Sequence, residues 1–402
     1  MTTTAHTSDL DLFSDETLAD PYPLYAQLRD LDSAVYMERL GVWAVGRHED
    51  VRAALKDPVT FGSEGGVALT DAANQQILAG TVLASDGDHH RRLRRVLARQ
   101  LGQPAIAKLT DLVRERAQQL VGQAVEHGTF DAVDLARRMV ADTVMELMGL
   151  PDSTRQTVLD GAAPTFDCFG PANQRFLDAA PAAAAMVAFL HKAVTRTTVR
   201  PGSWMAGIYE AVDAGALGEH EATPLMSAYT AAGMDTTILG IASTIHLLST
   251  HPEQWALVRE DRTRFLGTAG NAFHEALRLE APVQGFGRRV TTETTIGDTR
   301  IGPGQQVWLL YGSAGRDPRR WDNPDRFDVR RRDANQHLSL GAGPHACAGN
   351  HLAELQATAL VEALAARCRA VEPAGAERGL NNVLRGWRRL PVTITLDDAC
   401  AA

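Results

Sequence analysis

A cysteine near the C-terminal end of the chain, Cys347, lies in the run LGAGPHACAG and has the setting of a metal ligand. Gly341, Gly343 and Gly349 surround it, and glycine lets a backbone turn tightly and approach a flat, bulky group. Residues 349–366, rich in Ala, Leu and Glu, predict a helix. Cys347 would then lie at a helix N-terminus, where the dipole and free N–H groups favour a thiolate. Such a thiolate binds a soft metal or a haem iron.

Two other interpretations of Cys347 are open. It could be a small buried residue in a glycine-rich loop, because free cysteine is often buried. It could also bind zinc together with His345 and His351, although this spacing matches no common zinc pattern and the chain has no CxxC pair. The remaining cysteines have no comparable setting and are interpreted as structural or incidental: Cys168, Cys368 and Cys400.

A second chemical signal lies in a long apolar stretch. Between Ala222 and Pro252 the only residue with a full charge at neutral pH is Asp235. The stretch is too rich in Ser, Thr and Gly to predict a membrane span, and an all-round apolar helix is usually a core helix. An acid beside Thr236 is costly there unless it is functional or hydrogen-bonded. Thr236 could bend the helix by bonding the carbonyl one turn earlier, the Asp–Thr pair could transfer protons, and both can hold.

Composition narrows the function classes. The net charge of −9, from 40 basic and 49 acidic residues, argues against a nucleic-acid partner. Four scattered cysteines in 402 residues fit a reducing cytosol. The polar, acidic start MTTTAHTSDLDLFSDE indicates neither a signal peptide nor a membrane anchor. We find no linker or repeat, so the chain is predicted to be one domain over 1–402, with 1–20 as a loose N-terminal arm.

Periodicity predicts a mainly α fold with a small β portion. Helical spacing covers 21–29, 48–55, 104–125, 131–148, 176–196, 222–252, 252–259 and 269–279. Strand signals are fewer and cover 35–45, 305–310 and 391–396.

Four separated motifs give the chain a family resemblance: DGDHHRRLRR, AGMDTT, EALR and LGAGPHACAG. In this order they resemble a soluble bacterial cytochrome P-450, a haem-thiolate monooxygenase, and the similarity runs from DPYPLYAQLRD to LRGWRRLPVTI. The resemblance implies the P-450 fold with a long central helix over the haem, haem b as cofactor, dioxygen as co-substrate, and ferredoxin with ferredoxin reductase as electron donors. It also implies a cytoplasmic monomer that binds no membrane.

The resemblance assigns roles near the iron. Cys347 would be the axial ligand, with Leu340 standing where the family usually has Phe, a change that could alter the redox potential. Thr236 would donate a hydrogen bond to dioxygen and Asp235 would supply protons. The groups that would hold the macrocycle or leave room beside it are His90, Arg94, Arg288, His345, Gly349, Ala232 and Gly233. His89 remains an alternative to His90, because spacing alone does not separate them.

The EALR motif implies structural support rather than chemistry. Glu275 and Arg278, three apart on a helix face, can pair. The resemblance makes this a buried pair, joined by Arg326 of the PDRF run, that holds the side of the protein around the cysteine loop.

The substrate pocket is inferred by resemblance to be apolar and partly aromatic. Its expected lining is Leu69, Phe166, Phe169, Tyr229, Ala232, Val283, Phe286 and Leu384. The runs FGSEGGVALTD, APVQGFGRRVTTE and LNNVLRGWRRLPV look like those of methoxybenzoate O-demethylases, but Ala228 and Ala231 stand on the helix and Ser63 and Glu64 in the loop where these enzymes bind a carboxylate. An unpaired anion in such a pocket is costly. We therefore expect a small, neutral aromatic substrate that is hydroxylated or O-demethylated.

Two further functions remain as alternatives. One is hydroxylation of a larger natural-product skeleton, such as a terpenoid or macrolide. The other is a non-catalytic haem-binding sensor or carrier, which would need no Asp235–Thr236 pair.

Overall fold

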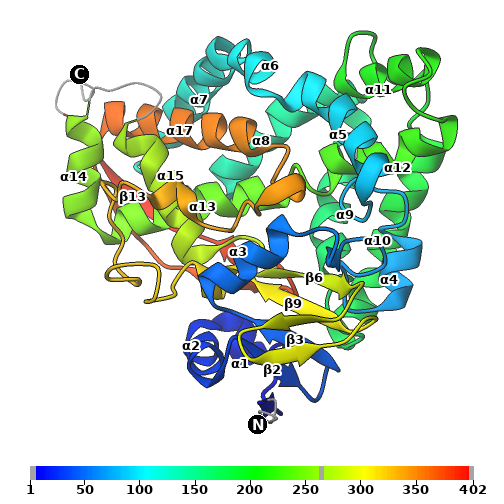
Figure 1. Ribbon diagram of the computed structural model, residues 1–402. Helices are drawn as coiled ribbons and strands as arrows, with labels where there is room; N and C mark the ends of the chain where they lie inside the picture. Colours follow the sequence, from blue (N-terminus) through cyan, green and yellow to red (C-terminus); the bar gives the residue numbers. More distant parts are fainter. Residues whose placement is uncertain (1–5, 262–266, 398–402) are drawn as a thin grey trace.

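The computed structural model describes residues 6–261 and 267–397 and shows a mainly helical protein with a small β portion, as the sequence predicts. The helices gather above a sheet that lies near the N-terminus (Figure 1). The α-helices are α1 Asp15–Ala19, α2 Tyr22–Leu31, α3 His48–Lys56, α4 Asp71–Gln76, α5 Gly87–Leu101, α6 Gln103–Ala107, α7 Thr110–Val125, α8 Ala132–Met148, α9 Arg155–Asp167, α10 Gln174–Lys192, α11 Trp204–Asp213, α12 Glu219–Thr230, α13 Asp235–Thr250, α14 Pro252–Glu260, α15 Thr268–Glu280, α16 Tyr311–Ala314 and α17 Asn350–Arg367. Three short 3₁₀ turns are η1 Asp152–Thr154, η2 Ala334–Gln336 and η3 Gly343–His345.

The largest sheet has six strands in the order β1-β2-β3-β9-β6-β4. These strands are β1 Thr7–Ser8, β2 Ala34–Met37, β3 Val42–Val45, β9 Gln306–Leu310, β6 Gly285–Val290 and β4 Phe61–Gly62. A second sheet joins β10 Cys368–Pro373, β13 Pro391–Leu396 and β5 Thr129–Asp131, and two hairpins pair β11 Glu377–Leu380 with β12 Arg385–Arg389 and β7 Thr294–Ile296 with β8 Thr299–Ile301.

The predicted strand over 35–45 is wrong in one respect, because β2 and β3 form an antiparallel pair there, with Tyr36 opposite Trp43. Gly41, at φ +68°, provides the left-handed turn that the reversal requires. Strand β6 was not predicted, because GFGRRV lacks alternating apolar residues. It forms because β9 and the 66–67 backbone lie close: a Cβ on Gly287 would stand 2.3 Å from the Gly66 carbonyl oxygen.

The long apolar stretch, predicted as one helix, forms two consecutive helices, α12 and α13, which are divided at Ala232 and Gly233, where the resemblance implied that room is left beside the macrocycle. Residues 231–234 between them form a turn. A Cβ on Gly233 would lie 2.5 Å from the carbonyl oxygen of Tyr229, so the chain packs too closely here for a side chain. The stretch Glu219–Thr250 is long and apolar enough to cross a membrane, but 67% of its apolar window is buried inside the protein, as in a core helix.

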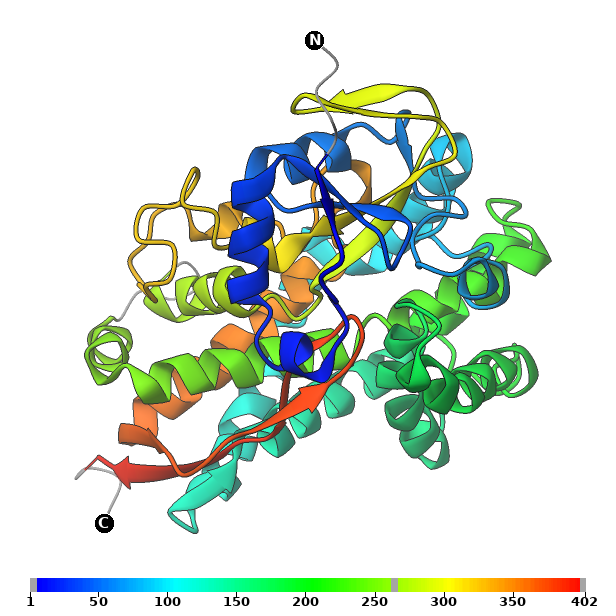
Figure 2. The ribbon, with the colours of Figure 1, turned by 90° about the horizontal axis from the view of Figure 1, so that it is seen from below.

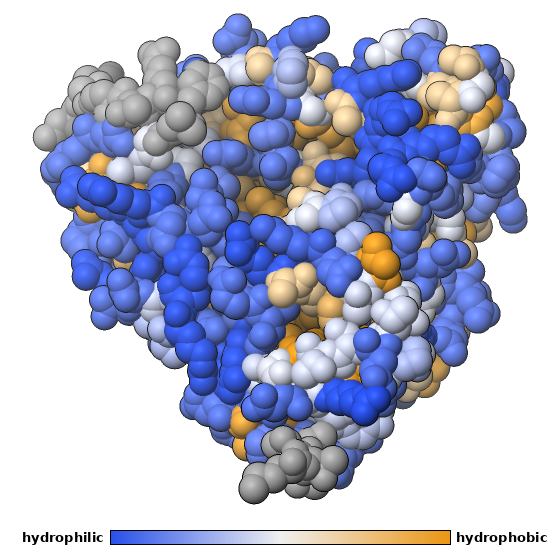
Figure 3. Space-filling view, viewed as in Figure 1, coloured by the Kyte–Doolittle hydropathy of each residue, from blue (hydrophilic) through white to orange (hydrophobic). Residues whose placement is uncertain are grey.

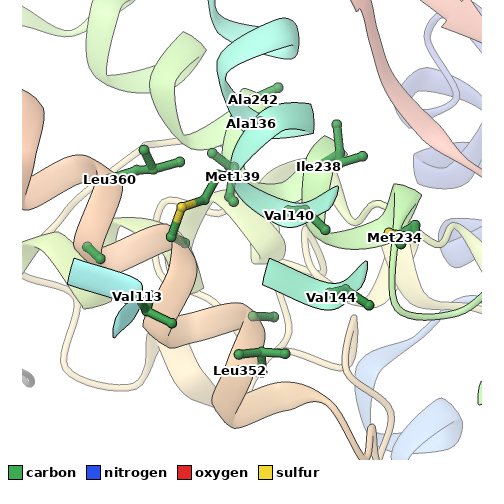
Figure 4. Close-up of a cluster of buried hydrophobic side chains, with 14 of the residues drawn as sticks. Val113, Ala136, Met139, Val140, Val144, Met234, Ile238, Ala242, Leu352 and Leu360 are labelled. Atoms are coloured by element: carbon green, nitrogen blue, oxygen red, sulfur yellow. The ribbon is translucent and has the colours of Figure 1, made fainter. Parts of the chain in front are cut away.

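Helix α13 lies at the centre of the larger core. Side chains of α7, α8, α13 and α17 meet there, among them Val113, Met139, Val140, Ile238 and Leu360 (Figure 4). Burying each such side chain contributes about 1.5–3 kcal/mol relative to exposure. The core therefore fixes the position of α13 relative to α17, the helix that follows the cysteine loop.

The predicted helix over 104–125 is divided as well, into α6 and α7, with Lys108 and Leu109 between them. On the surface, apolar side chains are seen mainly in hollows between polar ones on the face viewed in Figure 3.

The N-terminal segment is packed rather than loose from residue 6 onward, which corrects the expectation of a free arm over 1–20. Leu12 and Phe13 are buried, and the Phe13 ring lies 6.2 Å from that of Trp308. The carbonyl of Ala19 accepts a hydrogen bond of 2.7 Å from Arg385, so the start of the chain contacts its last hairpin (Figure 2). Residues 1–5 lie outside the described part.

The Glu275–Arg278 pair is fully buried, with nitrogen–oxygen distances of 2.7 and 2.8 Å. Its third member differs from the prediction. Arg331 donates from Nε to Glu275 at 2.9 Å, whereas Arg326 is exposed and contributes only its carbonyl, which accepts from Arg278 at 3.0 Å. A backbone carbonyl does not depend on residue type, so the side chain at position 326 carries no signal for this contact.

These contacts predict that Arg331→Ala lowers the free energy of unfolding by about 1–3 kcal/mol, because it leaves the buried Glu275 carboxylate short of a charged donor. Arg326→Ala, the matched control, should change it by less than about 0.5 kcal/mol. Urea unfolding of both variants measures this difference. Equal losses would contradict the assignment.

Candidate active site

The cysteine loop is closed by backbone hydrogen bonds. The Cys347 N–H donates to the Leu340 carbonyl at 2.8 Å, and the Gly341 N–H donates to the Leu338 carbonyl at 2.8 Å. Gly341 and Gly343 have φ values of +69° and +68°, which favour glycine. A Cβ on Gly343 would lie 2.5 Å from the carbonyl oxygen of Leu55, so the loop rests directly on the end of α3.

The sulfur of Cys347 opens into the main cavity, and α17 begins at Asn350, as the predicted helix requires. Desolvation by the surrounding protein is the largest effect and raises the pKa of the Cys347 thiol overall. The N–H groups of Gly349 and Asn350 lower this pKa, as expected at a helix N-terminus, and the charge of Arg94 acts in the same direction. A coordinated metal deprotonates a thiol outright, so the thiolate form is expected with the metal bound.

The break between α12 and α13 forms the opposite side of the cavity. Ala232, Gly233 and Thr236 line it. The Thr236 hydroxyl donates to the Ala232 carbonyl at 2.9 Å, the helix-bending bond considered from the sequence.

Asp235 does not line the cavity. Its Oδ2 is buried, with no hydrogen-bond partner in the described protein. Burial raises its pKa to about 6, although Arg137 and the Ala163 N–H act in the opposite direction. The structure therefore separates the two residues: the Thr236 side chain faces the cavity, and the Asp235 carboxyl lies behind it.

The four predicted cationic or donor groups line the same cavity: His90, Arg94, Arg288 and His345. The His90 and His345 rings have centroids 4.1 Å apart. Arg94 donates to the Ala346 carbonyl at 2.7 Å, and the buried Arg288 to the Gly287 carbonyl at 2.7 Å.

The structure also separates His89 from His90. The His89 ring lies 2.9 Å from Glu221, which also accepts a hydrogen bond from Arg92 at 2.6 Å, away from the cavity. His90 is buried, and its Nε2 has no partner among the described residues. Burial first, then His345 and Arg94, lower the pKa of His90 to about 4. The buried Nε2 of His90 is therefore free to bond a polar group of a ligand.

Sequence reasoning missed two residues that position His345. Its Nε2 lies 3.2 Å from the Ser63 hydroxyl and 3.4 Å from Asp86. Asp86 also accepts from the N–H groups of Ser63 and Glu64, each at 2.8 Å. Ser63 thus points to His345 and does not line the main cavity, which no local pattern in FGSEGG indicates.

Six of the eight predicted pocket residues line the cavity: Phe166, Phe169, Tyr229, Ala232, Val283 and Phe286. Leu69 and Leu384 do not. The N–H of Leu69 donates to the Phe169 carbonyl at 2.9 Å and its side chain packs in the second core, while Leu384 borders a separate small cavity. Lining residues that the sequence did not reveal include Met186 of α10 and Trp204 of α11.

The cavity residues fit a haem. One face presents a thiol sulfur, and the same cavity holds two arginines and two histidines, one with an unpaired buried nitrogen. Charge-assisted hydrogen bonds from such groups suit two propionates. Zinc gains no support, because residues 6–261 and 267–397 contain no group of three His, Cys, Asp or Glu residues placed to hold a metal. Cys168 and Cys368 are buried, and Cys400 lies outside the described residues.

The fold and site define a haem-thiolate protein, and comparisons with known proteins agree. The family model "Cytochrome P450" matches residues 204–378. The chain is 35% identical over 391 residues to "Cytochrome p450 CYP199A2" of Rhodopseudomonas palustris, covering 96% of this chain and 94% of that protein. It is 31% identical over 405 residues to "Cytochrome P450 monooxygenase PikC" of Streptomyces venezuelae, covering 96% and 93%.

A solved structure of cytochrome P450 CREJ in complex with (4-ethylphenyl) dihydrogen phosphate superimposes with a TM-score of 0.85 at 25% identity, covering 94% of this chain and 98% of that one. The chain belongs to the cytochrome P450 family. It is therefore a monooxygenase that binds haem b and uses dioxygen, an organic substrate and electrons from a redox partner.

We predict that His90→Ala weakens haem retention by about tenfold or more, because it removes a buried donor to a charged group. His89→Ala changes the neighbouring residue on the same helix and should leave retention unchanged. Transfer of haem to an excess of an apo-haem scavenger, followed in the Soret region, measures both rates. Faster loss from the His89 variant would reverse the assignment.

Proposed function

We propose that this cytochrome P450 inserts one oxygen atom into a compact, neutral aromatic substrate, by hydroxylation or by O-demethylation of an aryl ether. The observation that carries the proposal is the character of the cavity wall, which is aromatic and, away from the donors that suit the propionates, uncharged. Haem, when bound, supplies the activation of dioxygen and of the substrate bond. The protein supplies position, protons and exclusion of water.

Three phenylalanines form the aromatic part of the wall. Phe166 and Phe169 meet edge to face with centroids 5.4 Å apart, and Phe286 lies 6.5 and 6.2 Å from them. They come from α9, the segment after it and β6. Aromatic rings prefer such offset and edge-on contacts, so this corner suits a flat ring. The ligand of the CREJ complex also carries a phenyl ring, which supports an aromatic substrate, although its phosphate gives no support for a neutral one.

Charge in the cavity favours a neutral substrate. The fully charged residues among its described lining are Arg94 and Arg288, and both donate to backbone carbonyls. If they also hold the propionates, as we propose, no cation remains for a substrate carboxylate. Burying an unpaired carboxylate is costly.

We propose the following roles for the site residues. Cys347 is the axial ligand of the iron, and His90, Arg94, Arg288 and His345 bind the propionates. Gly349 and the opening at Ala232–Gly233 leave room for the macrocycle and dioxygen. Thr236 donates a hydrogen bond at the oxygen site, and Asp235 returns protons to it from behind the helix. The raised pKa of Asp235 supports this last role, because a carboxyl that titrates near pH 6 can both hold and release a proton.

Electrons come from an external donor, and we propose ferredoxin with ferredoxin reductase, with the enzyme acting as a cytoplasmic monomer. The exposed side of α5 offers arginines for an acidic partner. Arg91 and Arg92 are paired with Asp88 and Glu221, which leaves Arg95 and Arg99 as the candidates to test for salt-sensitive electron transfer.

The substrate class is tested with 4-methylanisole and 4-methoxybenzoate, which have similar shape but differ in charge. We expect the neutral ether to bind at least about tenfold more tightly, since the acid loses its hydration without gaining a partner. The shift of the ferric Soret band on titration measures both dissociation constants. Tighter binding of the benzoate, or a shift only with a macrolide or terpenoid, would refute the proposal.

The proton route is tested with Thr236→Ala against Thr244→Ala. Both hydroxyls belong to α13 and donate to the carbonyl four residues earlier, at 2.9 and 2.8 Å, but only Thr236 lines the cavity. We expect Thr236→Ala to lower the ratio of product to NADH consumed by about tenfold or more, with Thr244→Ala leaving it unchanged.

The pH dependence has a definite sign. Asp235 is protonated below its raised pKa of about 6 and charged above it, so the product-to-NADH ratio should fall as pH rises through 6. Asp235→Asn should abolish this dependence. A ratio equal to that of the parent in Thr236→Ala, or unchanged pH dependence in Asp235→Asn, would exclude the route.

A further inference from the structure

Outside the cavity, three side chains form a connected set of polar contacts on the cysteine side of the protein. Glu354 of α17 lies 3.3 Å from Nε2 of His274 on α15. Nδ1 of His274 lies 3.3 Å from Nε2 of His337, the residue that follows η2. Nδ1 of His337 accepts a hydrogen bond of 3.2 Å from the backbone N–H of Ser339.

These contacts fix where the protons lie. Because Nδ1 of His337 accepts from an N–H, the neutral ring carries its proton on Nε2 and donates to His274. His274 then accepts at Nδ1 and donates from Nε2 to the Glu354 carboxylate. With both imidazole rings neutral, each of their four nitrogens then has a complementary donor or acceptor as its partner. Burial, together with the nearby His274, Arg278 and His48, holds the pKa of His337 well below its usual range, which agrees with a neutral ring.

This set of three side chains joins the two segments that flank the cysteine loop. At one end, Ser339 precedes Leu340, whose carbonyl accepts the Cys347 N–H at 2.8 Å, and the Ser339 hydroxyl donates to the Leu277 carbonyl of α15 at 2.6 Å. At the other end, Glu354 lies about one turn beyond Asn350 on α17. The N–H groups of Gly349 and Asn350, at the start of this helix, face the sulfur.

From this geometry we infer that Glu354, His274 and His337 are positioning residues that hold the Cys347 sulfur in register with the N–H groups at the start of α17. The set, named here the histidine bracket, touches neither the cavity nor the proposed oxygen site. It acts through the loop, and hydrogen bonds to a metal-bound sulfur govern the reduction potential of the centre. Breaking the bracket is therefore predicted to change the midpoint potential of the haem and to weaken the bond from the thiolate to the iron, and not only to lower the stability of the fold.

The bracket is separate from the buried Glu275–Arg278 pair on the same helix. That pair contacts Arg331 and the 315–326 backbone, whereas His274 turns to α17 and to the segment before the cysteine. His274 and Glu354 have side-chain exposures of 16% and 30%, so both can be changed without opening the core.

The experiment compares Glu354→Ala with Glu362→Ala in the haem-loaded, full-length enzyme. Glu362 is a matched control: it lies on α17, is 29% exposed and pairs with Arg114 at 3.3 Å. Two quantities are measured, the midpoint potential of the haem and the rate at which the reduced, carbon monoxide-bound protein loses its red-shifted Soret band. We expect Glu354→Ala to accelerate this loss about tenfold and to shift the potential, with Glu362→Ala changing neither.

Two further variants test the connection itself. His274→Asn keeps an acceptor for His337 but cannot reach Glu354, so it should reproduce Glu354→Ala, and the double variant should be no worse than either single one. Glu354→Gln keeps an oxygen acceptor and should behave like the parent. The inference is overturned if the potential and the band are unchanged while the thermal midpoint falls equally in the Glu354 and Glu362 variants, or if the effects of His274→Asn and Glu354→Ala add.

Discussion

The structure depends on presenting one sulfur atom at the wall of an otherwise apolar cavity. The loop that does this turns twice through left-handed glycines and is closed by the Cys347 N–H to the Leu340 carbonyl. A loop of this kind has little stability of its own, because its backbone bonds are few and its residues are small. It is held in place by α3, α15 and α17, and each of these helices packs into one of the two cores.

Burial of polar groups follows from the same requirement. Glu275 and Arg278 are fully buried, and Arg331 and several backbone carbonyls complete their hydrogen bonding. On the cavity side, the histidines and arginines are only partly satisfied by the protein, and His90 keeps an unpaired nitrogen. The polar groups that support the loop have hydrogen-bond partners within the protein, whereas those that face the cavity keep hydrogen-bonding capacity for a ligand. This difference distinguishes the residues that support the loop from those that bind a ligand.

How much was predictable depended on whether the signal was local. The setting of Cys347 and its glycines, the place of Thr236 at the cavity and the class of fold could be predicted from the sequence, because the residue types and the helical spacing are recognisable in neighbouring residues. The position of the Asp235 carboxyl outside the cavity could not. The contributions of Ser63, Asp86 and Arg331 could not, because each acts through a partner brought near by the tertiary structure. Hydrophobic periodicity also could not predict the division of the long apolar stretch at 231–234, because the apolar pattern is the same on both sides of the turn. The raised pKa of Cys347 shows a further limit: the helix N-terminus beside it was predictable, but the desolvation by the surrounding protein was not.

The packing of residues 6–20 has a consequence for the order in which the protein folds. Phe13 rests on Trp308, and the Ala19 carbonyl is bound by Arg385. This segment therefore contacts a residue 366 positions later in the chain, and its native contacts cannot form until that later segment has been synthesised. Closing so long a loop is slow compared with forming local helices, so this corner is expected to be among the last to assemble and to leave Leu12 and Phe13 exposed to chaperones during synthesis.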